Sequence, residues 1–64
     1  MAKTNVKVKL SGTDGNVFAL AGKVSGALRK AGYTDLAKEF TSELFKQSSY
    51  GAALQLMGEY VEVS

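Results

Sequence analysis

The chain has 64 residues, a formal net charge of +2, 45% hydrophobic residues, and neither cysteine nor histidine. This composition is typical of a single small folded domain and argues against disorder. It excludes a disulfide framework and removes the usual ligands of a zinc or transition-metal site, so we expect no metal and no cofactor. Self-association remains as a means of reinforcing so small a core.

The first ten residues, "MAKTNVKVKL", indicate where the protein resides. They contain lysines but no apolar segment of signal-peptide length. No apolar run in the chain approaches the roughly 20 residues that a membrane span requires. We therefore expect a soluble, cytoplasmic protein in which residues 1–64 form one domain, with residues 1–4 flexible.

The segment "NVKVKL", residues 5–10, predicts the first strand. Val6, Val8 and Leu10 recur with period 2 and would point to one buried face. Lys7 and Lys9 would point to the opposite face, toward solvent. The segment therefore has the pattern of a half-buried strand.

The last residues, "YVEVS", predict a second strand in which Val61 and Val63 flank Glu62. If the two strands pair, Lys7 or Lys9 would face Glu62, which favours the pairing by roughly a few tenths of a kcal/mol. Three helices that each reverse the chain would make the strands parallel, and one skewed short helix would make them antiparallel. Both directions stay open.

The glycine-rich segment "SGTDGNVFAL", residues 11–20, separates the first strand from a helix. It lacks the spacing of phosphate-binding loops, because Gly22-Lys23 is followed by Val24 and no glycine stands five positions earlier. We interpret the segment as a tight turn in which Asp14 or Asn16 caps the helix and Gly15 takes a positive φ.

Apolar residues with helical spacing predict the first helix over residues 17–30. Gly32 suits the left-handed position that ends a helix, and Arg29 and Lys30 suit the negative end of its dipole. The apolar arc consists of Val17, Leu20, Ala21, Val24, Ala27, Leu28 and Ala31.

Two further helices are predicted. The second begins at Thr34 as N-cap and is broken by "QSSYG". The third covers about residues 50–57, is capped by Ser48 or Ser49, and ends at Gly58. The apolar stripe of the second helix consists of Leu36, Ala37, Phe40 and Leu44. Its solvated face consists of Lys38, Glu39, Glu43 and Lys46. The third helix is expected to bury Tyr50, Ala53, Leu54 and Met57.

The order strand, three helices, strand predicts an α+β domain with β-α-α-α-β topology, in which a two-stranded sheet is packed by helices on one face. A lone strand pair is marginal in water. Its open edges could therefore pair with a second copy to form a four-stranded sheet.

The outer side of the first helix contains a candidate interface formed by Phe18, Gly22 and Gly26. Two glycines inside a helix cost roughly 1 kcal/mol each relative to alanine, so another interaction should offset them. The favoured interpretation is close packing of the glycines against the third helix or a strand. The alternative is a dimer contact or partner groove that uses Phe18 and the smooth glycine face.

Basic residues form a second candidate surface, a nucleic-acid contact. The segment "ALRKAGYTDLAKEF" has the layout of a helix-turn-helix centre, but its second helix would expose Glu39 and Glu43 toward the acidic groove of DNA. We therefore favour simple solvated faces over a binding surface. The candidate residues are Lys7, Lys9, Lys23, Arg29 and Lys30.

The sequence favours no enzymatic activity. Without His or Cys, a catalyst would need paired carboxylates, an activated Ser or Lys, or a bound metal. The six carboxylates show no motif spacing beyond Glu39 and Glu43 on one helix face. A chain of this length also offers little cleft for a small-molecule substrate.

Two segments, "VKLSGTDGNVFALAGKVSGALRKAG" and the closing "YVEVS", resemble small uncharacterised bacterial and phage-associated proteins. The resemblance implies the same β-helical-β layout and no catalytic residue. The residues that carry it are Leu10, Gly12, Asp14, Gly15, Asn16, Phe18, Ala27, Leu28, Ala31, Gly32, Tyr60, Val61 and Val63. We therefore expect an interaction domain that binds itself or a protein partner, with a weak nucleic-acid-binding module as the alternative.

Overall fold

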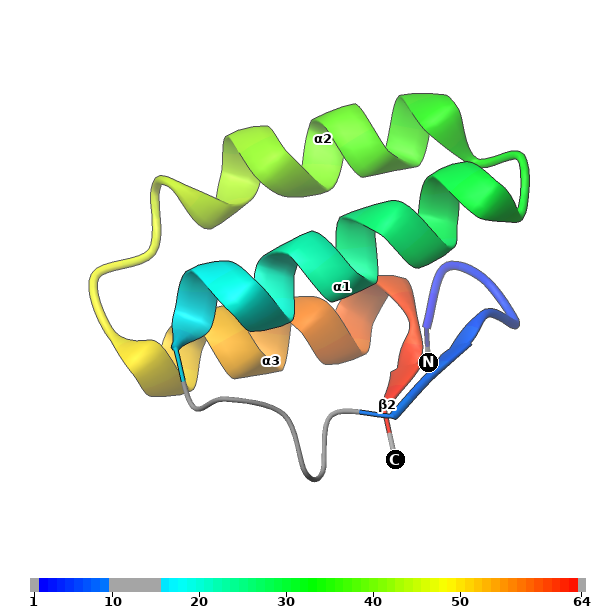
Figure 1. Ribbon diagram of the computed structural model, residues 1–64. Helices are drawn as coiled ribbons and strands as arrows, with labels where there is room; N and C mark the ends of the chain where they lie inside the picture. Colours follow the sequence, from blue (N-terminus) through cyan, green and yellow to red (C-terminus); the bar gives the residue numbers. More distant parts are fainter. Residues whose placement is uncertain (1, 10–15, 64) are drawn as a thin grey trace.

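The computed structural model describes residues 2–9 and 16–63 and has the predicted β-α-α-α-β order (Figure 1). The predictions for Leu10, Gly12, Asp14 and Gly15 lie outside the described residues. The elements are β1 (Lys7–Val8), α1 (Val17–Lys30), α2 (Thr34–Leu44), α3 (Tyr50–Tyr60) and β2 (Glu62–Val63).

The two strands pair in parallel, with Lys7 in register with Glu62 and Val8 with Val63. Three successive helices each reverse the chain, so β2 runs in the direction of β1, and the two ends of the chain meet at the sheet (Figure 1). The predicted facing of Lys7 and Glu62 is thereby confirmed.

The two strands differ in how they bury their valines. Val8 is buried while Lys7 is exposed, as the alternation predicts. In the predicted C-terminal strand the alternation fails: Val61, which precedes β2, is buried, but Val63 is 44% exposed. Val61 directly follows α3 and packs into the core, whereas Val63 lies two residues further along.

Helix α1 has the predicted bounds. Its N-cap is Asn16, whose side-chain oxygen accepts a hydrogen bond of 2.8 Å from the Phe18 N–H. The predicted apolar arc forms the core face, with Val17 and Ala27 partly buried against it. Ala31 is exposed, because it is the C-cap residue and no longer lies on the helical face. The buried residues of α1 are Leu20, Ala21, Val24 and Leu28.

The turn between α1 and α2 leads into a helix that begins at Thr34, as predicted, but whose N-cap is a different residue. Gly32 has φ +92°, as predicted, and its N–H donates to the Arg29 carbonyl. The Tyr33 N–H donates to the Leu28 carbonyl at 2.8 Å, which completes a Schellman motif. The Tyr33 carbonyl then accepts from Ala37, so Tyr33, not Thr34, is the N-cap of α2.

Helix α2 buries the predicted stripe, with Ala37, Phe40 and Leu44 in the core and Leu36 partly buried. Helix α1 lies alongside α2, and the two run in opposite directions (Figure 1). The core between the helices and the sheet is therefore built mainly from one face of each helix.

Helix α3 is longer than predicted and buries a different set of residues. The Ser49 side chain caps it, as one of the two predicted options, by accepting from Ala52 at 3.1 Å. Gly58 lies inside the helix, which continues to Tyr60 because the Tyr60 ring packs edge-to-face on Phe40, with centroids 5.4 Å apart. The buried residues are Ala53, Leu56, Met57 and Tyr60. Leu54 is only partly buried, and Tyr50 is 48% exposed instead of buried.

Two residues of the N-terminal segment, expected to be flexible, make specific contacts. The Lys3 N–H donates to the Glu59 carbonyl at 2.8 Å. Thr4 is buried, and its hydroxyl donates to the Tyr60 carbonyl at 2.8 Å and accepts from the Val6 N–H at 3.1 Å. These bonds tie the start of the chain to the end of α3.

Candidate functional site

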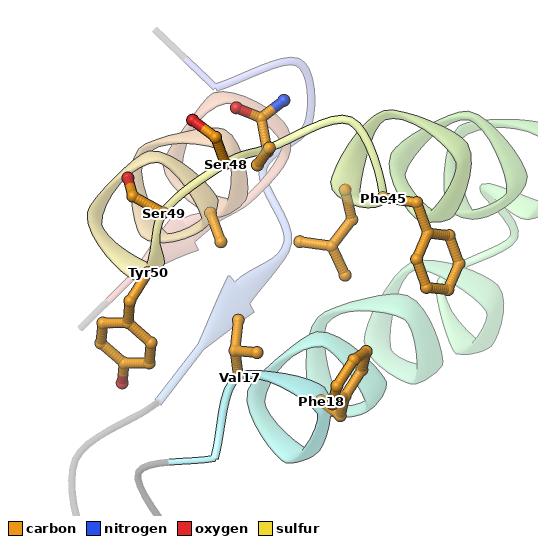
Figure 2. A pocket seen from close by; sticks show the side chains of 9 residues that line it. Val17, Phe18, Phe45, Ser48, Ser49 and Tyr50 are labelled. Carbon is orange, nitrogen blue, oxygen red and sulfur yellow. The ribbon is translucent and has the colours of Figure 1, made fainter.

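A groove of about 360 Å³ opens where the N-terminus of α1, the C-terminus of α2 and the N-terminus of α3 come together (Figure 2). Its described lining is mostly apolar, with polar side chains contributed by the connection between α2 and α3. The lining residues are Val17, Phe18, Leu44, Phe45, Gln47, Ser48, Ser49, Tyr50 and Ala53.

Three aromatic side chains at this groove remain exposed to solvent. Phe18 is 66% exposed, Phe45 71% and Tyr50 48%. Figure 2 shows the Phe18 and Phe45 rings on one side of Val17 and the Tyr50 ring on the other. Burying one phenylalanine is worth about 1.5–3 kcal/mol, and exposed apolar residues that cluster mark interaction sites more often than scattered ones do. The groove is therefore the leading candidate for a binding surface.

The ends of the helices explain why these aromatic side chains project outward. Phe18 is the second residue of α1, Phe45 is the C-cap of α2, and Tyr50 is the first residue of α3. In each helix the buried stripe begins or ends beside the aromatic residue, with Leu44 buried directly before Phe45 and Ala53 buried one turn after Tyr50. Leu44 and Ala53 form the apolar floor of the groove and belong to the core. The three exposed aromatic side chains form its rim and lie outside the core.

The structure contradicts the favoured interpretation of the two glycines in α1. Gly22 and Gly26 are exposed, and a Cβ built at either position meets nothing within 4 Å. They therefore do not pack against α3 or a strand. They lie on the solvent side of α1 and continue the exposed surface from Phe18, which lies one turn before Gly22. This placement leaves the partner-facing alternative as the open hypothesis.

The five basic residues of the predicted nucleic-acid contact are all exposed. Lys7 lies in β1, Lys9 follows that strand, and the other three lie in α1. Lys7 lies in register with Glu62, so a carboxylate accompanies the lysine of β1. Helix α1 differs, because its sequence "VFALAGKVSGALRK" carries three basic residues and no acidic one. The positive charge of α1 is thus not compensated within the helix.

A second polar cluster joins the N-terminal segment to α2 and α3. The Lys3 ammonium lies 2.8 Å from the Glu39 carboxylate and 4.5 Å from the centre of the Tyr60 ring. The Tyr60 hydroxyl donates to the same Glu39 oxygen at 2.6 Å. The hydrogen bond from Lys3, and to a smaller extent the one from Tyr60, lowers the pKa of Glu39. The same bond to Glu39 raises the pKa of Lys3. Burial, and then the Glu39 bond, raises the pKa of Tyr60.

Stability is expected to fall in acid because of this cluster. A lowered pKa of Glu39 contributes stability above the ordinary carboxyl pKa of about 4.3, and this contribution is lost as pH falls through the lowered value. We expect Glu39→Gln to lower the urea midpoint at about pH 6 and to lower it much less at about pH 3. Glu43→Gln is the control. The Glu43 carboxylate lies 3.4 Å from the ammonium of Lys46, three residues along the chain near the C-terminal end of α2, so this ion pair is local. An equal loss at both pH values would contradict the assignment.

The sequence singled out Phe18 but not the other two aromatic residues of the groove. Tyr50 was expected in the core, and Phe45 lies just beyond the predicted apolar stripe of α2. The available signal was the position of Phe45 next to Leu44 and immediately before the polar break "KQSS". An aromatic residue that follows the last buried position of a helix lies at the rim of the core.

Comparisons of the chain with protein-family models, curated proteins and solved structures find no match. Across residues 2–9 and 16–63, no helix has both the length and the apolar content needed to cross a lipid bilayer. The same ranges bring together no group of three His, Cys, Asp or Glu side chains that would hold a metal ion. Function is therefore inferred from the groove and the surface charges.

Proposed function

We propose that this domain binds another protein chain, either a partner or a second copy, through the groove between α1, α2 and α3. The observation that carries the proposal is the cluster of three exposed aromatic residues, Phe18, Phe45 and Tyr50, around an apolar floor. Aromatic residues are enriched among the anchors of protein interfaces, where they fill pockets on the partner.

The chemistry of the groove favours binding over catalysis. Its described lining offers hydroxyl groups and one amide, from Gln47, Ser48, Ser49 and Tyr50, but no carboxylate or amine. General acid–base catalysis or an activated nucleophile would call for such groups. The proposal is therefore a non-enzymatic interaction domain, and we place it in the cytoplasm.

A photo-crosslinking amino acid at position 18 tests this function in the cells that produce the protein. We expect a discrete adduct from position 18 and none from position 38, where exposed Lys38 lies on α2 and does not line the groove. The purified adduct partner should bind the wild-type domain about 30-fold more tightly than Phe18→Ser, the loss typical of an interface anchor. Equal adducts at both positions, or none, would overturn the proposal.

Light scattering on the purified domain decides whether the partner is a second copy. If it is, the wild-type mass will be that of a dimer, and Gly22→Leu and Phe18→Ser will both give monomers with unchanged circular dichroism. A dimer that persists in both variants would place the contact away from this surface.

Nucleic-acid binding is the second candidate function, and the observation that favours it is that α1 carries three basic residues and no acidic one in its sequence. Contacts to phosphates would make binding strongly salt-dependent. A fluorescence titration with duplex and single-stranded DNA at low salt tests this candidate. Binding that weakens with salt and is lost in Arg29→Glu supports it, and no salt-sensitive binding removes it.

A further inference from the structure

The exposed side of α1 continues from the groove along one line of residues. Phe18, Gly22 and Arg29 follow one another at i, i+4 and i+11, which keeps them within a sector of about 40° around the helix axis. All three are exposed. We call this line the α1 track. It begins at the groove with Phe18 and ends with Arg29 in the last turn of α1.

Gly22 on the α1 track, and Gly26 about 40° beside it around the helix, allow another backbone to come close. A Cβ built at Gly22 or at Gly26 meets nothing within 4 Å, so the space in front of both glycines is open. Helices pack at the short end of their interaxial range where the contact residues are small. A partner helix lying across these glycines would therefore approach α1 closely and bury part of its surface. Larger side chains at the same positions would hold the two helices apart.

The charge along the α1 track defines the chemistry of what lies on it. The first six residues of α1, "VFALAG", are uncharged, and Arg29 ends the track. Lys30 and Lys23 lie beside the track, about 100° and 120° around the helix from Arg29, and α1 carries no acidic residue. A second copy of α1 offers no carboxylate to these cations, whichever direction it runs. A nucleic acid would meet uncharged residues over the first two turns and an apolar groove. An acidic protein segment meets neither difficulty.

From these observations, and resting on the proposed function, we infer that the partner is an amphipathic helix with acidic residues bordering its apolar face. Its apolar face contacts Phe18 and Phe45 at the groove, and its backbone passes over Gly22 and Gly26. Its carboxylates face the cations at the C-terminal part of α1. With a rise of about 1.5 Å per residue, Phe18 and Arg29 are about 16 Å apart along α1. The apolar anchor and the acidic cluster of the partner are therefore about three helical turns apart.

A displayed library of helical peptides, about 18 residues long, tests this inference by selection on the intact domain and on the charge-reversed variant Arg29→Glu/Lys30→Glu. On the wild-type domain we expect peptides with apolar residues at i, i+3, i+4 and i+7 and an excess of Asp and Glu. On the variant we expect peptides with the same apolar spacing and an excess of Lys and Arg. Lys38→Glu is the matched control and should select the wild-type set.

Single variants then place a selected peptide on the α1 track. Phe18→Ser should lower its affinity about 30-fold and Gly22→Leu about ten-fold, measured by fluorescence anisotropy with circular dichroism as the check on folding. Gly22→Ala, which adds one methyl group in open space, should change the affinity little and confirms that bulk is responsible for the Gly22→Leu effect.

The failures of the two proposals are distinguishable. Selected peptides that need Phe18 but carry no acidic excess, or that are the same for the wild-type and charge-reversed domains, overturn the acidic helix and leave the groove as a binding site. Peptides that ignore Phe18→Ser overturn the groove as well. A selection that enriches no peptide overturns the acidic helix, while the crosslinking from position 18 still decides the proposed function independently.

Discussion

Phe40→Ala is expected to leave the domain largely unfolded at room temperature. The Phe40 side chain is fully buried, and its ring packs edge-to-face on Tyr60 at 5.4 Å. Truncation of a buried phenylalanine costs about 3–5 kcal/mol. A single core in a chain below about 70–80 residues rarely supplies more net stability than about 3–5 kcal/mol. The loss from this one truncation is therefore comparable with the entire free energy of unfolding of the domain.

Thermal and urea denaturation followed by far-ultraviolet circular dichroism measures this loss. The matched control is Phe45→Ala, which removes the same side chain from a position that is 71% exposed, and it should change stability by less than about 0.5 kcal/mol. A cooperative transition in Phe40→Ala near that of the wild type would show that the core does not depend on Phe40.

Thr4→Val is expected to lower the free energy of unfolding by about 2 kcal/mol or more. The valine keeps the shape of the side chain but removes its hydroxyl, which leaves the Tyr60 carbonyl without its donor and the Val6 N–H without its acceptor. Each buried polar group that loses its partner costs about 1–3 kcal/mol. For a domain of this size, the melting temperature should fall by about 8–16 °C.

Thr4→Ser is the control for this prediction, because it keeps both hydrogen bonds and loses only a methyl group worth about 0.8 kcal/mol. Scanning calorimetry should therefore rank wild type, Thr4→Ser and Thr4→Val in decreasing order of melting temperature. If both variants lose the same stability, the packing of the side chain matters and its hydroxyl does not. Loss in neither variant would mean that the segment before β1 is flexible, as its sequence indicates.

Local patterns in the sequence were enough to predict the elements. The helical spacing of Leu20, Val24 and Leu28 gives α1 its buried face, and Gly32 ends it with the positive φ that glycine tolerates. The alternation around Val8 predicts β1. These signals are local because hydrogen bonding within a helix and the direction of side chains along a strand depend on neighbouring residues.

The candidate site was predicted only in part. Phe18 was identified because it lies beside Gly22 and Gly26 on the helical wheel, which is a relation within one helix. Phe45 and Tyr50 reach the same groove from the ends of two other helices. No pattern within either helix predicts that these helix ends come together. The exposure of Tyr50 likewise depends on the rotation of α3, which places Leu56 and Tyr60 in the core instead.

Local sequence patterns are enough to predict the order of elements, the core face of α1 and the turn at Gly32, because each depends on residues within a few positions of one another. Tertiary packing sets the parallel strand pairing, the bonds of Lys3 and Thr4 to the end of α3, and the exposure of Gly22 and Gly26. Each of these depends on how separate helices and chain ends are placed relative to one another. The joining of Phe18, Phe45 and Tyr50 into one groove has the same origin, since three helix ends must meet to form it.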